Sequence, residues 1–315
     1  MQRVNATRQR VTGTDPQREI PIWLWMSLPI AVLAIAGSII AVVFDETIYE
    51  KETANWAAQA VGQDIANLVA YPALLVFAYF AARGSLRALL GWIGVLVYSA
   101  YTYVIYVFDI NFGPLFLLWV AVFGLSIYAL IGGLSSIDAA QVKARPNARA
   151  PVRMTGGLLL GIGCGFYLLW LSEIVPSLID GMTPEVLTEA GVPTNPVHVL
   201  DLSLFLPAAI LAGALLLKRR PWGYVLAPVI LVAMVFISFG IVSLTTVVGA
   251  RGLEGTPAVG VGVAVLALIE LIVAGRFLGS LRDTTASSAP EQRRDGPTEK
   301  LVERREGHRR VGVGG

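Results

Sequence analysis

Several stretches of this chain run for about twenty residues or more without a charged side chain. Residues 22–44, 65–82 and 222–248 contain no Asp, Glu, Lys or Arg. A helix that crosses the roughly 30 Å apolar core of a bilayer needs about 20 apolar residues, and soluble domains rarely contain charge-free runs of this length. The composition agrees, because 55% of the 315 residues are hydrophobic and only 15% are charged. The pattern predicts a polytopic membrane protein and argues against a soluble enzyme, a nucleic-acid-binding protein or a secreted disulfide-rich domain.

Eight segments reach the length of a membrane span, which predicts an all-α bundle of eight transmembrane helices. We expect a cytoplasmic segment over residues 1–21, a transmembrane domain over 22–279 and a disordered tail over 280–315. The tail is polar and of mixed charge, and it has no apolar period. The predicted spans are 22–44, 64–82, 88–108, 114–134, 155–176, 197–217, 222–248 and 257–277.

The distribution of basic residues predicts the orientation. With eight spans and a cytoplasmic N-terminus, 22 of the 24 Lys and Arg residues fall on the cytoplasmic side. Only Lys51 and Arg251 fall outside, as the positive-inside rule requires. We therefore expect a multi-pass protein of the cell membrane with both termini in the cytoplasm. The expected partner is the lipid bilayer, no nucleic acid is expected, and the oligomeric state is left open.

The two halves of the chain share a pattern. Each half opens with one span and a long acidic loop, and its second helix starts with a polar pair three residues apart. These pairs are Asp64 with Asn67 and His198 with Asp201. The pattern predicts a 4+4 parallel internal repeat of the kind found in some transporters. The alternative, that short helical hairpins resemble one another without being repeats, stays open.

Polar residues inside a bilayer are costly and are therefore candidates for function. Most of them gather at the outer ends of the predicted helices, where we expect an outward-facing polar pocket. Its ligand classes are a cation, a lipid headgroup or a small polar solute, as in a transporter. The candidate residues are Asp64, Asn67, Tyr101, Glu173, His198 and Asp201.

Two other interpretations of these residues stay open. In the first, the protein is a membrane-embedded enzyme, with an acid–base pair or a divalent metal at His198, Asp201, Glu173 and Asp64, since carboxylates and imidazole suit such ions. In the second, the protein has a structural or partner-binding role. Asp64 and Asn67 would then lie at a helix N-terminus, where a carboxylate favours the positive end of the dipole. No cofactor is predicted other than this divalent metal, and the single cysteine excludes a CxxC redox pair.

Two further features lie deeper in the predicted spans. Glu270 has no other charged residue at its depth, so it either couples proton movement or hydrogen-bonds to a neighbouring helix. Gly157, Gly161 and Gly165 form two overlapping GxxxG steps. Such steps allow another helix to approach closely, which predicts a packing role.

Three stretches carry a resemblance to a known family. They are QDIANL at 63–68, the tyrosine-rich stretch 101–130, and the stretch 195–228 that begins NPVHVLDL. Together they resemble a bacterial family of uncharacterised multi-pass integral membrane proteins. The resemblance implies a helix bundle of this kind and brings no activity with it.

Overall fold

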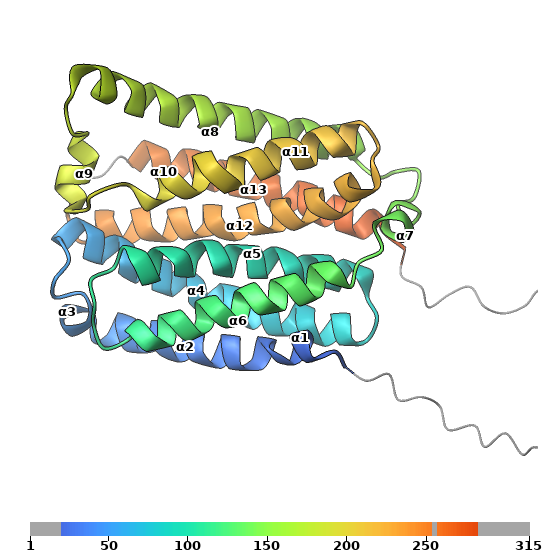
Figure 1. The fold of residues 1–315 in the computed structure, drawn as a ribbon, viewed down its shortest axis with the longest axis horizontal. Helices are drawn as coiled ribbons and strands as arrows, with labels where there is room; N and C mark the ends of the chain where they lie inside the picture. The colour runs from blue at the N-terminus through green and yellow to red at the C-terminus, as the bar shows by residue number, and fades with distance from the viewer. Residues whose placement is uncertain (1–19, 254–256, 283–315) are drawn as a thin grey trace, which may run out of the picture. The chain divides into compact units, whose positions relative to one another are not determined.

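The computed structural model describes residues 20–253 and 257–282, and in this part of the chain eight helices are long and apolar enough to span a membrane. The all-helical fold class is therefore confirmed. The long helices run side by side (Figure 1). The predicted segments 1–21 and 280–315 lie almost wholly outside the described residues. The elements are α1 (Ile22–Trp25), α2 (Ser27–Val43), α3 (Asp45–Ile48), α4 (Ala54–Ala82), α5 (Leu86–Phe108), α6 (Phe116–Ser135), α7 (Ala139–Lys143), α8 (Val152–Asp180), α9 (Glu185–Ala190), α10 (Pro196–Leu200), the π-helical turn η1 (Asp201–Phe205), α11 (Leu206–Leu217), α12 (Pro221–Ala250) and α13 (Pro257–Ser280).

The two ends of this bundle differ in charge. One end, here called the basic end, carries the turn after α4, the segment around α7, the turn after α11 and the end of α13. The other, the acidic end, carries α3, the α5–α6 turn, and α9 with its flanking loops. At the basic end, Pro146 forms an antiparallel bridge with Leu281, and the Arg87 guanidinium donates to the Leu281 carbonyl. These contacts fix the end of α13 against the α6–α8 connection and the start of α5.

The largest difference from the predicted boundaries is at α4, which begins ten residues before the expected start. Thr53 caps it, because the Thr53 side chain accepts a hydrogen bond from the backbone N–H of Trp56 at 3.3 Å. The residues between 54 and 64 include several polar side chains, so the apolar run that predicts a membrane span starts only near residue 64. The interpretation of Asp64 as a helix-terminal residue stabilised by the dipole is therefore wrong, since dipole effects fade within the first turn.

Two prolines shape the helices in which they lie. Proline has no N–H, and its ring clashes with the carbonyl four residues earlier. Pro29 accordingly follows a break at Met26, so that the first span consists of α1 and α2. Pro207 follows η1, where the helix widens into a π-helical turn before α11.

The two halves have the same order of neighbouring helices. In the first half, α2 packs on α4, α4 on α5, α5 on α6, and α6 closes against α2. In the second half, α8 packs on α11, α11 on α12, and α12 on α13, but α13 and α8 have few contacts. This order is what a 4+4 repeat predicts, except that the second half stays open. α12 joins the halves by packing on α4 and α5.

The predicted packing role of Gly157, Gly161 and Gly165 is wrong for the described part of this chain. A Cβ atom built on any of the three meets no heavy atom within 4 Å. The neighbouring face of α8 makes the close contact instead. A Cβ on Gly156 would lie 2.7 Å from Leu217 Cγ, and one on Gly163 would lie 2.7 Å from Ile210 Cγ1, both on α11.

Candidate functional site

A buried carboxyl group, Asp64, lies at the centre of the first half. Its side chain is 2% exposed. Ser38 donates to Oδ1 at 2.8 Å, Tyr106 donates to Oδ1 at 3.0 Å, and Tyr49 donates to Oδ2 at 2.5 Å. Among the described residues, no Lys, Arg or His forms an ion pair with it. The carboxyl group is therefore held by three hydroxyl groups and no basic side chain.

The three hydroxyl donors come from separate segments. Ser38 lies on the buried face of α2, where its neighbours are small residues such as Ala34 and Ala41, and Tyr106 lies near the end of α5. Tyr49 follows α3 in the acidic-end loop and is buried. This loop is held in place beside Tyr49, because Lys51 Nζ donates to the Phe112 carbonyl at 3.0 Å.

A second polar layer adjoins Asp64. Asn67, fully buried, donates to Ser38 Oγ at 3.3 Å and accepts from the Tyr98 hydroxyl at 2.7 Å. Gln63 in turn donates to Tyr98 at 2.7 Å. The structure thus brings Asp64 and Asn67 together, as their spacing predicts, and satisfies both of them with residues of α2, α4, α5 and the loop after α3.

Further buried hydroxyl groups extend this network into the first half. Tyr71 and Ser99 share a hydrogen bond of 2.8 Å, and Ser99 and Ser126 share another of 2.8 Å. The Tyr103 ring lies between these groups and Asp64, with its centroid 6.1 Å from that of Tyr71 and 5.2 Å from that of Tyr106. Buried hydroxyl groups thus form one set around Asp64 and another from Tyr71 to Ser126 in the middle of α6.

The second half contains a separate polar cluster. Asp201, 8% exposed, accepts from the Tyr101 hydroxyl at 3.0 Å and from the Trp170 indole N–H at 2.9 Å. The centroids of the His198 and Trp170 rings are 4.4 Å apart, and His198 Nε2 lies 3.6 Å from Glu173 Oε2. Glu173 is half-exposed, so this cluster reaches the surface of the bundle.

The local sequence explains the position of His198 and Asp201. The Asn195 side chain caps α10 by accepting from the backbone N–H groups of Val197 and His198, and Pro196 occupies the first turn. Asp201 then begins the π-helical turn η1. The Tyr167 hydroxyl donates to the Leu202 carbonyl at 3.2 Å and so satisfies a backbone group in this widened turn. Such turns are often found at functional sites.

The six candidate residues of the predicted pocket therefore fall into two sets. Tyr101, Glu173, His198 and Asp201 form one cluster, and Asp64 with Asn67 forms another. In the described part of the chain, no hydrogen bond or ion pair joins the two. The described residues also contain no group of three or more His, Cys, Asp or Glu side chains placed to hold a metal. The predicted ligand set of Asp64, Glu173, His198 and Asp201 is not brought together.

Glu270, on α13, is 1% exposed and belongs to neither cluster. Ser238 of α12 lies close to it, and its Oε2 atom has no hydrogen-bond partner among the described residues. A half-satisfied buried carboxyl group is compatible with both interpretations given from the sequence. It remains a candidate for proton coupling.

Three contributors to the Asp64 site were not among the sequence candidates: Ser38, Tyr49 and Tyr106. Ser38 is one of two serines in an otherwise apolar span, which is a weak signal for a buried partner. The excess of tyrosines in α5 indicated a polar face there. Nothing in the sequence placed Tyr49, in a loop, against a carboxyl group fifteen residues later.

The α5–α6 turn at the acidic end carries another carboxyl group that was not a candidate. Burial and the negative charge of Glu52 raise the pKa of Asp109 to about 6, although the Trp56 indole opposes this shift. Glu52 itself accepts from the backbone N–H of Asn111 at 2.8 Å. This turn is thus tied to the loop that carries Tyr49.

Comparison of the chain with known protein families, curated proteins and solved structures finds no match.

Proposed function

We propose that this integral membrane protein is a proton-coupled transporter in which Asp64 carries the proton. The observation that supports this is the buried Asp64 carboxyl group, which has three hydroxyl donors and no basic partner. A buried charge without a counter-charge costs several kcal/mol. The site therefore favours a positive partner, and ionisable residues at membrane depth commonly serve proton or ion pathways.

The hydroxyl groups around Asp64 suit both protonation states of the carboxyl group. Serine and tyrosine hydroxyls donate one hydrogen bond and can also accept. An ionised Asp64 accepts from Ser38, Tyr49 and Tyr106, as in the structure. A protonated Asp64 donates to one of them, and that hydroxyl group turns its own proton to another neighbour. A site that binds and releases a proton needs this adaptability.

The geometry around Asp64 also favours some of the expected ligand classes over others. The three hydroxyl groups contact the carboxylate oxygens directly, so the enclosed Asp64 suits a proton or a small cation better than a lipid headgroup or a polar solute. A second set of buried hydroxyl groups, from Tyr71 to Ser126, lies in the same half and is the candidate for the next part of a proton route. Glu270 in the second half is the second proton-carrying candidate. The positive-inside rule supports a cytoplasmic location for the basic end and for both termini.

The enzyme alternative has less support. Both oxygens of Asp201 are engaged, with Tyr101 and Trp170, and Glu173 with His198 supplies only two ligands for a metal. Zinc sites generally need at least three protein ligands. An acid–base role for His198 and Glu173 would need a substrate at the exposed side of Glu173.

The test is proton movement in proteoliposomes. Protein is reconstituted with a pH-sensitive dye inside the vesicles, and a potassium diffusion potential drives protons inward. We expect the wild type to acidify the lumen and Asp64→Asn to reduce this rate to that of empty vesicles. Asp138→Asn, which changes an exposed carboxyl group at the basic end, is the matched control and should retain the rate. Equal rates for wild type and Asp64→Asn would contradict the proposal.

A further inference from the structure

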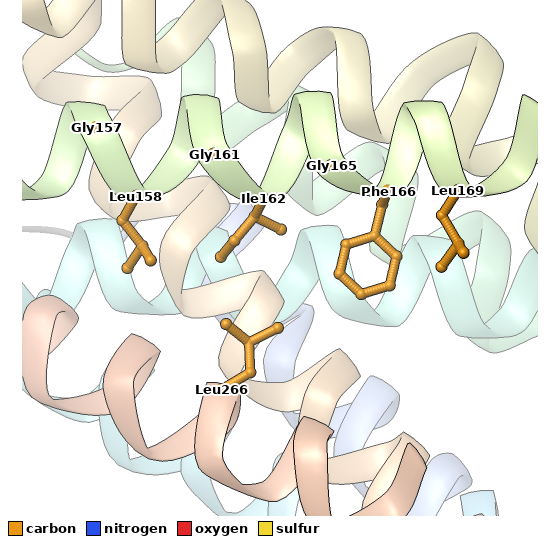
Figure 2. Close-up of a pocket in the computed structure, with 8 residues that line it drawn as sticks. All are labelled: Gly157, Leu158, Gly161, Ile162, Gly165, Phe166, Leu169 and Leu266. Atoms are coloured by element: carbon orange, nitrogen blue, oxygen red, sulfur yellow. The ribbon is translucent and has the colours of Figure 1, made fainter. Parts of the chain in front are cut away.

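An apolar groove lies between α8 and α13 in the second half. It has a volume of about 430 Å³. Figure 2 shows that Gly157, Gly161 and Gly165 form its glycine edge on α8, while the side chains of residues such as Ile162 point towards Leu266 of α13. The corresponding helices of the first half, α2 and α6, pack against each other. The groove thus occupies the gap that keeps the second half open.

The length and the lining of the groove suit a single alkyl chain. The groove follows α8 from Gly157 to Leu169, a length of about 18 Å at 1.5 Å per residue. It is lined by glycines and apolar side chains alone, as contact with a hydrocarbon chain requires. The missing Cβ atoms of the three glycines let a thin chain lie close to the α8 backbone.

Charge at one end of the groove identifies the headgroup. Arg153 lies four residues before Gly157 and continues the same ridge of α8 to the basic end, where it is exposed and has no ion-pair partner among the described residues. Arg276 is exposed near the same end of α13. The described part of the basic end carries eleven Lys and Arg residues but a single acidic one, Asp138. Basic residues beside an apolar site attract anionic lipid headgroups.

We infer that the α8–α13 groove is a binding site for a phospholipid with an anionic headgroup, from the leaflet at the basic end. One acyl chain lies along Gly157, Gly161 and Gly165, and the phosphate lies at Arg153. This site is independent of the proton-binding role of Asp64. A bound acyl chain would fill the gap between α8 and α13 and so complete the second half.

The experiment measures retained lipid by native mass spectrometry. Wild type and variants are reconstituted in vesicles of equal parts phosphatidylcholine and phosphatidylglycerol and then extracted in mild detergent. We expect one phosphatidylglycerol on the wild type and none on Gly161→Leu, whose side chain fills the groove. Gly124→Leu is the matched control, because a Cβ on Gly124 of α6 also meets open space. It should keep the lipid.

A second variant tests the headgroup. Arg153→Glu should lower the preference for phosphatidylglycerol over phosphatidylcholine by at least about fivefold, the effect expected of one basic residue near an anionic surface. Arg149→Glu, at the same end but outside the ridge, should not. Equal lipid on wild type and Gly161→Leu, or equal retention of the two lipids by the wild type, would overturn the inference. A dimer that Gly161→Leu abolishes without a change in bound lipid would overturn it in favour of a second copy of the chain.

Discussion

The two halves of this bundle place four helices in the same order but fill the space between them differently. The first half closes on itself and encloses polar side chains, with Asp64 in the middle and hydroxyl groups around it. The second half leaves α8 and α13 apart, and its polar cluster lies at the acidic end beside the half-exposed Glu173. One half therefore has a sealed polar core, and the other has an apolar groove open to lipid.

This difference follows from where each half places its small residues and its hydrogen-bonding groups. In the first half, small residues and glycines bring helices into contact. Gly62 also brings α4 against α12, the helix that joins the halves, since a Cβ there would lie 2.3 Å from the Cα of Leu244. In the second half, Gly156 and Gly163 bring α8 against α11, but three other glycines of α8 face open space. Small residues thus make close helix contacts in both halves, and in the second half they also create a surface for a ligand.

The largest expected effect tests this contrast between glycines. Gly62→Ala should destabilise the protein by about 3 kcal/mol, because overpacking against backbone forces α4 and α12 apart. Gly161→Ala on the open face should change stability by no more than about 1 kcal/mol, with the helix propensity of alanine in its favour. Thermal unfolding in detergent measures both. Similar losses for the two variants would contradict the contrast.

A smaller loss of stability is expected when one hydrogen-bond donor is removed, and this loss should differ between the two halves. Tyr106→Phe removes one donor from the enclosed Asp64 and should cost about 1–3 kcal/mol, as for a buried acceptor left short of a partner. Tyr167→Phe removes the donor to the Leu202 carbonyl on the partly exposed side of α8 and should cost about 1 kcal/mol or less. Unfolding of both variants under the same conditions provides the comparison. A greater loss for Tyr167→Phe would show that the polar core of the first half is not the more tightly satisfied one.

The pH dependence of stability sharpens the description of the acidic end. The pKa of Asp109 is about 6 in the folded protein, whereas an ordinary aspartate carboxyl group has a pKa near 3.8. The folded state therefore holds this proton more tightly, and the stability that the neutral group contributes is complete below about pH 4. It is lost as the pH rises towards 6, by about 1 kcal/mol after allowance for solvent screening. Asp109→Asn should remove this part of the pH profile, and an unchanged profile would contradict the assignment.

The smallest expected effect concerns an ion pair between the halves. Arg251, after α12, pairs with Asp45 at 2.5 Å, and both side chains are partly exposed. Arg251→Gln should cost between about 0 and 1 kcal/mol, as for other exposed pairs. A loss of several kcal/mol on thermal unfolding would mean that the halves depend on this surface contact more than on the packing of α12 against α4 and α5.

The sequence predicted features that depend on a single helix. It did not predict contacts between segments that are distant in the chain. Apolar length predicted the eight spans, and spacing of three residues predicted that Asp64 and Asn67 share a face. The direction of the α8 glycines and the partners of Asp64 depend on tertiary packing, which local spacing does not encode. Tyr49 is the clearest case, because its role arises only when the loop after α3 folds back over α4. For the same reason, the single predicted pocket proved to be two clusters, which have only α5 in common.

The central claim is that Asp64 binds and releases a proton inside the first half. Infrared spectroscopy of the protein in lipid vesicles, titrated with pH, tests it most directly, since a protonated carboxyl group has its own C=O stretching band. We predict a band from an enclosed carboxyl group that changes reversibly with pH, is missing in Asp64→Asn and is retained in Asp201→Asn. A spectrum in which no pH-dependent band is lost in Asp64→Asn, while the protein stays folded, would contradict the claim.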